Sequence, residues 1–138
     1  MGLLSDFILA DASEAVDFRS IDSLRHFPIL DASDVDPLIL AELWCILEGG
    51  EPLERVEHFT LLHEESAEEW VYAVPEELLA LVSALEEKDT AETVRLWVEE
   101  EEMKGVDVSA AYDFIQRWQK FIKRGQDEGK RMLLRQAL

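Results

Sequence analysis

The sequence is most informative between residues 36 and 50, where it reads Asp36-Pro37-Leu38-Ile39-Leu40-Ala41-Glu42-Leu43-Trp44-Cys45-Ile46-Leu47-Glu48-Gly49-Gly50. Aspartate is a good helix N-cap, and proline suits the first helical position because its missing N–H would have no partner there. The glycine pair supplies a helix end. Residues 38–47 are apolar almost all round, and a helix without a polar face is buried on most sides. We therefore expect this helix to run through the centre of the domain.

The chain before this helix predicts one strand and one short helix. Residues 7–9 form an apolar run closed by Asp11, which is typical of a strand. Asp11 followed three positions later by Glu14 is a capping pattern, so we expect a short helix over residues 11–18. The apolar residues of segment 20–35 show no helical or strand periodicity, and the segment contains Pro28. It therefore predicts a loop with an extended piece at residues 27–30.

The chain after the central helix predicts three strands and three helices. Residues 50–55 indicate a turn-rich connection, and two extended pieces then form a hairpin around the acidic turn 64–69. The predicted strands are residues 57–63, 70–74 and 132–134. The predicted helices start at Pro75, at Asp89 and near Ser109; the second runs through residues 99–102 to Gly105, and the third reaches Glu128.

This order indicates an α+β fold, because helices stand between short strands with no regular βαβ succession. We expect a small sheet of short strands covered by about four to five helices. The length of 138 residues suits a single domain over residues 1–138.

The composition describes an acidic domain with enough apolar surface to fold. There are 31 Asp and Glu against 13 Lys and Arg, for a formal net charge of −18, yet 48% of the residues are hydrophobic. A disordered acidic tail lacks such surface to bury. The net charge disfavours nucleic acid and anionic membrane as partners. The N-terminus does not resemble a signal peptide, and Cys45, the single cysteine, cannot form an internal disulfide, so we expect a cytoplasmic protein.

The charge is unevenly distributed along the chain. Residues 117–138 carry a net charge of +5, whereas residues 1–116 carry −23. On the last predicted helix the cations share the face opposite the apolar one, and they are candidate contacts for an anion or a partner: Arg117, Lys120, Lys123 and Arg124. Alternatively, this basic end lies against the acidic body and offsets its self-repulsion.

The four tryptophans lie on apolar segments, so we expect most of them in the core. Trp70 is the exception, because it follows the polar turn 64–69 and is expected at the rim of the sheet. Tryptophan is enriched at binding hot spots, so Trp70 is a candidate interface residue.

Few residues suggest catalysis or metal binding. The common phosphate-loop, hydrolase and metalloprotease motifs are absent from the sequence. His58 and His63 stand at odd spacing in a predicted strand, on opposite faces, and His26 is isolated. The four acids of residues 99–102 point around a helix axis and form a solvated face. We therefore predict no catalytic residue, cofactor or metal.

Three segments of the sequence are informative when taken together. They are the run Leu43-Trp44-Cys45-Ile46-Leu47-Glu48-Gly49, the helix opening Val74-Pro75-Glu76-Glu77-Leu78, and the turn Glu128-Gly129-Lys130 before the last predicted strand. In this order they resemble the YfbM-like domain-of-unknown-function family, with its "LHxLLTG" segment and its "LTPEEV…ALE" helix, although Glu48 stands where the family has threonine. The resemblance covers residues 36–138. It implies an α+β fold and no established activity, so no catalytic residue is carried over.

Charge and composition favour a non-enzymatic, acidic protein-interaction domain of the inhibitor, immunity or adaptor type. Its expected partner is a basic protein, because 29 acids are concentrated in residues 1–116. The alternative is a small metal-dependent or carboxylate-based hydrolase that uses His58 or His63 with nearby carboxylates.

Overall fold

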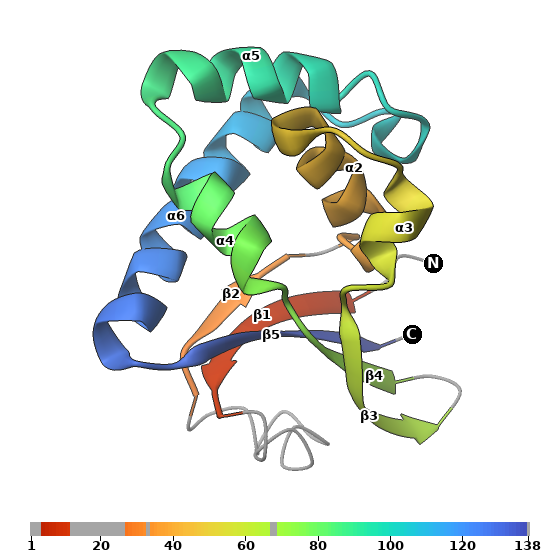
Figure 1. Cartoon of the computed structure of the whole chain (residues 1–138), viewed down its shortest axis with the longest axis vertical. Helices are drawn as coiled ribbons and strands as arrows, with labels where there is room; N and C mark the ends of the chain where they lie inside the picture. Colours follow the sequence, from red (N-terminus) through yellow and green to blue (C-terminus); the bar gives the residue numbers. More distant parts are fainter. Residues whose placement is uncertain (1–3, 12–26, 33, 67–68, 138) are drawn as a thin grey trace.

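The computed structural model describes residues 4–11, 27–32, 34–66 and 69–137. Within them an antiparallel sheet of five strands carries a layer of helices (Figure 1). The strands are β1 (Leu4–Ala10), β2 (Ile29–Asp31), β3 (Thr60–Ser66), β4 (Glu69–Ala73) and β5 (Arg131–Ala137). The helices are α2 (Pro37–Glu48), α3 (Pro52–Val56), α4 (Glu76–Ser83), α5 (Glu87–Trp97), the 3-10 helix η2 (Glu101–Met103) and α6 (Val108–Glu128). The predicted α+β class is confirmed.

Strands from the two ends of the chain form the middle of the sheet. The strand order is β2-β1-β5-β4-β3, and every neighbouring pair is antiparallel. β1 and β5 pair along their whole length, from Leu4 opposite Ala137 to Ala10 opposite Arg131. β5 also pairs with β4, so it joins the N-terminal strand to the β3–β4 hairpin. This order leaves β3 and β2 at the two edges.

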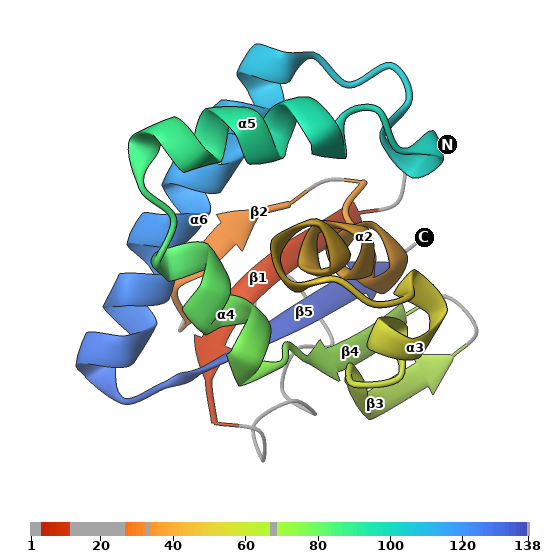
Figure 2. The same cartoon turned by 45° about the horizontal axis from the view of Figure 1, so that its top comes forward.

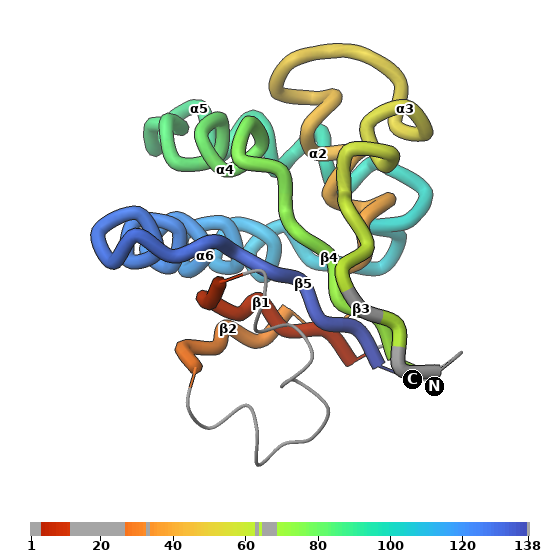
Figure 3. The backbone as a smooth tube through the Cα atoms, turned by 60° about the horizontal axis from the view of Figure 1, so that its bottom comes forward, coloured from red at the N-terminus to blue at the C-terminus, as the bar shows by residue number. Residues whose placement is uncertain are grey.

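The helices lie together on one face of the sheet (Figure 2 and Figure 3). Alternate residues of each strand face this layer, so Phe7, Leu9 and Leu134 belong to the same buried core as the helices. Trp44, Trp97 and Trp118 are at most 1% exposed, which confirms the expected core position of most tryptophans.

The central helix forms as its sequence predicts. The Asp36 carboxylate accepts a hydrogen bond of 2.8 Å from the Ile39 N–H, and Pro37 occupies the first turn. Gly49 ends the helix with φ +89°, a backbone conformation that side chains disfavour. Residues 39–44 of α2 are all buried. The helix therefore passes through the helical layer with almost no solvated face, as expected.

Aromatic rings connect the sheet to α6 and α5. The Phe7 ring of β1 stacks on the Trp118 ring with centroids 4.8 Å apart, and Phe114 lies 5.8 Å from Trp118. Phe114 in turn contacts the Trp97 ring of α5 at 6.3 Å. Each such pair adds about 0.5–1.5 kcal/mol beyond the burial of its surface. The rings thus hold α6 between β1 and α5.

Gly125 lets α6 approach β1 closely. A Cβ atom at this position would lie 2.8 Å from the Leu9 Cδ2 atom, closer than carbon atoms can approach. Leu9 is only 1% exposed, so it has little room to move away. The absence of a side chain at Gly125 is therefore a packing requirement.

Three segments correct the sequence prediction. Residues 52–56 of the expected turn-rich connection form helix α3, because Pro52 pre-sets the backbone of a first helical turn. The helix before residues 99–102 ends at Trp97, and Glu101–Met103 forms the separate 3-10 helix η2. β3 begins at Thr60 and runs to Ser66, with irregular pairing to β4, so it reaches into the expected turn 64–69. The predicted helix over residues 11–18 lies outside the residues described, apart from Asp11.

The second face of the sheet carries a smaller apolar cluster. Ile8, Ala10, Val71 and Leu133 are buried there, and Phe27 packs against them.

Among the residues described, no helix combines the length and hydrophobicity needed to span a membrane.

Candidate interaction surfaces

Trp70 lies in a groove between the sheet and the start of α2. The groove has a volume of about 460 Å³, and its apolar lining is Pro37, Leu38, Val56, Phe59, Trp70 and Tyr72. Trp70 and Tyr72 are alternate residues of β4, so their side chains point to the same side of the sheet. Both are half-buried, whereas Phe59 is buried. The groove thus presents two partly accessible aromatic rings beside the edge strand β3.

Carboxylates border this groove. Asp36 is one of its lining residues, and Glu64 of β3 pairs directly with Trp70 of β4. Burial raises the pKa of the Tyr72 phenol, and the negative charges of Glu64 and Asp36 raise it further. Both carboxylates therefore act electrostatically on the aromatic part of the groove. This site suits a group that is both apolar and positively charged.

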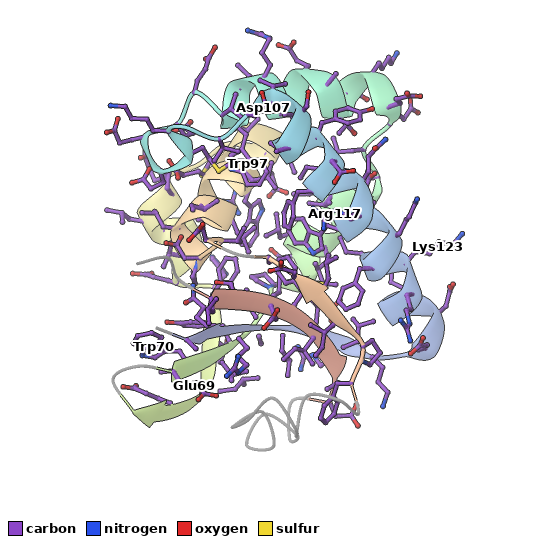
Figure 4. The ribbon with its side chains drawn as sticks, turned by 180° about the vertical axis from the view of Figure 1, so that it is seen from behind. Glu69, Trp70, Trp97, Asp107, Arg117 and Lys123 are labelled. Carbon is purple, nitrogen blue, oxygen red and sulfur yellow. The ribbon has the colours of Figure 1, made fainter. Side chains whose placement is uncertain are left out.

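The four cations predicted on α6 do not form one site. Arg117 binds Asp113 and Arg124 binds Glu128, each at 2.9 Å and each one helical turn away. Lys120 and Lys123 border a separate hollow of about 440 Å³ and make no ion pair with any described residue. Figure 4 shows that Arg117 and Lys123 lie at different levels along α6.

The cations beyond α6 contact the acidic part of the chain. Lys130 lies 3.9 Å from Asp11, and Arg131 lies 3.8 Å from Glu76. Arg135 is largely buried at 12% exposure, 3.3 Å from a Glu69 oxygen and 3.8 Å from an Asp6 oxygen. These contacts agree with the alternative in which the basic end offsets the acidic body.

The acidic charge is densest between residues 48 and 102. This segment holds 18 Asp and Glu against three Lys and Arg, for a net charge of −15. Many of its exposed carboxylates form no ion pair within the part of the chain that the structure describes: Glu51, Glu54, Glu57, Glu77, Glu86, Glu87, Asp89 and Glu101. They belong to α3, α4, α5, η2 and the adjoining loops, so the helical layer has a strongly negative surface.

Glu42 is a buried carboxyl group in the middle of α2. It is 5% exposed, and its Oε1 atom has no hydrogen-bond partner among the described residues. Burial raises its pKa to about 8, and hydrogen bonding and charge repulsion from Glu102 and Glu100 act in the same direction. Glu42 is therefore protonated at neutral pH.

A second polar cluster surrounds the indole of Trp44. The Arg55 guanidinium lies 4.6 Å from the ring centroid, and the exposed His58 ring lies 5.4 Å from it in an edge-on arrangement. Arg55 also donates to the Gly49 carbonyl at 2.9 Å. Burial raises the pKa of the Cys45 thiol although Arg55 acts against that shift, so this thiol is weakly nucleophilic.

Of the two histidines of the hydrolase hypothesis, His63 lies in a strand as predicted and His58 does not. His58 lies in the turn before β3 rather than in the strand, His63 is a residue of β3, and His26 lies outside the described residues. In the described ranges, no group of three or more His, Cys, Asp or Glu side chains is arranged to hold a metal ion.

A pocket of about 260 Å³ opens between α2, α5, η2 and α6. Its apolar walls are Val35, Ile39, Trp97, Met103, Val106 and Phe114, and charged residues stand among its lining, including Glu102 and Arg117. Figure 4 shows Trp97 beside α2 and Arg117 on α6, well away from Trp70. This pocket and the Trp70 groove are therefore separate sites.

One solved structure resembles this chain along nearly its whole length. It is the protein of unknown function YfbM from Escherichia coli, with a TM-score of 0.51 and 14% sequence identity, covering 98% of this chain and 99% of that one. At this identity the likeness concerns the fold, and it confirms the resemblance predicted for residues 36–138. It also includes the N-terminal part of the chain. No family model and no curated protein matches the sequence.

Sequence reasoning found Trp70 but missed Glu42 and the pocket beside Trp97. A signal for Glu42 was present, because it is the only charged residue between Leu38 and Leu47. The pocket had no such signal, since its walls come from segments far apart in the sequence.

Proposed function

We propose that this protein is a non-enzymatic interaction domain of the cytoplasm that binds a basic protein, as an inhibitor, an immunity-type protein or an adaptor does. The observation that carries the proposal is the Trp70 groove, where aromatic rings and carboxylates meet on a molecule of net charge −18. A lysine or arginine side chain has the matching chemistry, with an apolar stem and a cationic end.

The groove can anchor such a side chain through three interactions. The apolar stem of the lysine or arginine would pack on Trp70 and Tyr72. Its charged end would lie over an aromatic face, where Asp36 or Glu64 would neutralise the charge. Tryptophan and arginine are both enriched among residues that dominate binding energy. We therefore expect Trp70 to contribute more to binding than its exposed neighbours.

The acidic helical layer would act at longer range. A net charge of −15 over residues 48–102 attracts a basic partner and raises the rate of encounter, mostly at low salt. The same charge repels nucleic acid and anionic lipid, so we propose neither as a partner. The cytoplasmic location is supported by a lone cysteine, Cys45, whose chemistry suits a reducing compartment.

Affinity capture from the extract of the native cell tests the proposal. The full chain is immobilised, and bound proteins are identified after washing at low and at high salt. We expect a basic protein that is retained at low salt, released at high salt, and lost with Trp70→Ala and with Glu64→Lys.

Glu77→Lys is the matched control for Glu64→Lys, because it reverses an exposed charge on α4 away from the groove. It should weaken capture only slightly. Retention that does not depend on salt, or equal retention by the Trp70→Ala protein, would show that the groove does not carry binding.

A further inference from the structure

The pocket beside Trp97 has the form of a small-molecule site. Apolar side chains of α2, α5, η2 and α6 enclose a volume of about 260 Å³, and ligand sites are typically apolar hollows with a few polar groups that fix orientation. Two walls are aromatic, since Trp97 and Phe114 meet with their centroids 6.3 Å apart. Val106 is 41% exposed, so the apolar lining continues to the surface.

The charges around this pocket favour a cation. Glu102 is exposed and belongs to the lining, and Asp34 is a further lining carboxylate. The lining also contains the cation Arg117, but its guanidinium is bound to Asp113 at 2.9 Å, which neutralises most of its effect. Among the described residues that line the pocket, three carboxyl groups, with Asp31, therefore stand against one cation.

The buried Glu42 is a second, independent indication. It lies one turn along α2 from Ile39, a wall residue, and interacts with Glu102 at the pocket. Its Oε1 atom lacks a hydrogen-bond partner within the described structure, although the side chain is only 5% exposed. A cation bound at Glu102 would offset the negative charge that Glu102 and Glu100 place beside the Glu42 carboxyl group.

We propose that this pocket binds a small organic amine, with its apolar body against Val106, Ala110 and Phe114 and its ammonium group at Glu102. The pocket shares no lining residue with the Trp70 groove, although both use α2, so the proposal does not depend on the proposed protein partner.

Isothermal titration with three probes of similar shape tests the ligand class. Phenethylamine is the cation, phenethyl alcohol the neutral analogue and phenylacetate the anion. We expect the amine to bind about tenfold more tightly than the alcohol, as a charge-assisted hydrogen bond to the Glu102 carboxylate provides, and phenylacetate not to bind. Equal binding of all three probes, or preference for the anion, would overturn the proposal.

Two variants locate the site. Glu102→Gln should lower amine affinity about tenfold, to the level of the alcohol, and leave alcohol binding unchanged. Ala110→Leu, at an exposed position of α6 that lines the pocket, should fill it and abolish binding of both probes. Ala80→Leu is the matched control, because it adds the same side chain at an exposed position of α4. Unchanged binding by the Ala110→Leu protein would place the site elsewhere.

Proton release distinguishes binding at Glu102 from binding at another surface carboxylate. The ammonium group should lower the pKa of Glu42, so that amine binding at pH 7.5 releases part of a proton. Titrations in two buffers of different ionisation enthalpy measure this release. It should be absent with Glu42→Gln, and equal release by that variant would show that the amine does not bind at Glu102.

Discussion

At the scale of single residues, Glu42 makes the free energy of unfolding depend on pH. Its pKa of about 8 in the folded chain lies well above the ordinary value of 4.5 that it takes when unfolded. The folded chain therefore holds a proton that the unfolded chain has released between these two values. By linkage, this carboxyl contributes full stability below pH 4.5, and the contribution is lost as the pH rises towards 8.

Glu42→Gln tests this link. The amide keeps the shape of the protonated carboxyl, so the variant should match the wild type at pH 4.5 and be more stable at pH 8. At about 1.4 kcal/mol per pKa unit, a rise from 4.5 to about 8 makes the gain at pH 8 on the order of 4 kcal/mol. Urea unfolding at pH 4.5, 6 and 8 measures it. Glu54→Gln, at an exposed position of α3, is the control and should not change the pH dependence. A constant difference between wild type and Glu42→Gln would refute the raised pKa.

At the scale of elements, α6 stabilises the end of α4 through one side chain. The Gln119 amide donates to the Val82 carbonyl at 3.0 Å and to the Leu85 carbonyl at 3.1 Å. The Val82 carbonyl lies at the C-terminal end of α4, where it also accepts from the Leu85 N–H at 3.2 Å, and the Leu85 carbonyl lies two residues beyond the helix. Gln119 therefore acts as a C-cap contributed by another helix.

Gln119→Leu should lower the free energy of unfolding by about 1–3 kcal/mol, because the Leu85 carbonyl loses the Gln119 donor and the Val82 carbonyl keeps only backbone donors. Gln116→Leu, at an exposed position of the same helix, should change it by less than about 0.5 kcal/mol. Urea unfolding compares the two, and hydrogen exchange should show the loss first in α4. Equal effects of the two substitutions would mean that the cap contributes nothing.

The elements also show which local signals are reliable. Asp36, Pro37 and Gly49 mark the ends of α2 because capping depends on a few adjacent residues. The 3-10 helix η2 could not be foreseen, because the break after Trp97 lies within a continuous acidic run and has no glycine or proline. Tertiary contact fixes it: Met103 of η2 is buried in the core, at 5% exposure.

At the scale of the whole molecule, unbalanced charge should make stability depend on salt. The net charge is −18, and many exposed carboxylates of the described chain have no cationic partner. Salt screens their mutual repulsion over a Debye length of about 10 Å at 0.1 M. We expect the melting temperature to rise by several degrees, on the order of 1 kcal/mol in stability, between 20 and 500 mM sodium chloride.

A double variant that carries Glu86→Lys and Glu101→Lys is the control for this salt effect. It reverses two exposed charges and makes the net charge less negative by four, so the melting temperature should rise less with salt. A wild-type melting temperature that falls with salt would instead show that attractive pairs, such as Arg135 with Glu69, outweigh the repulsion.

The sequence alone determined the class of fold, the central helix and the partial exposure of Trp70. Each rests on local chemistry: caps, the pattern of apolar residues, and a tryptophan next to an acidic turn. Only the tertiary structure decided that β5 lies between β1 and β4, because strand order depends on contacts between distant segments. The same holds for the two sites. Trp70 and Asp36 come to line the same groove, and Glu42 comes to interact with Glu102, only when the helical layer packs on the sheet.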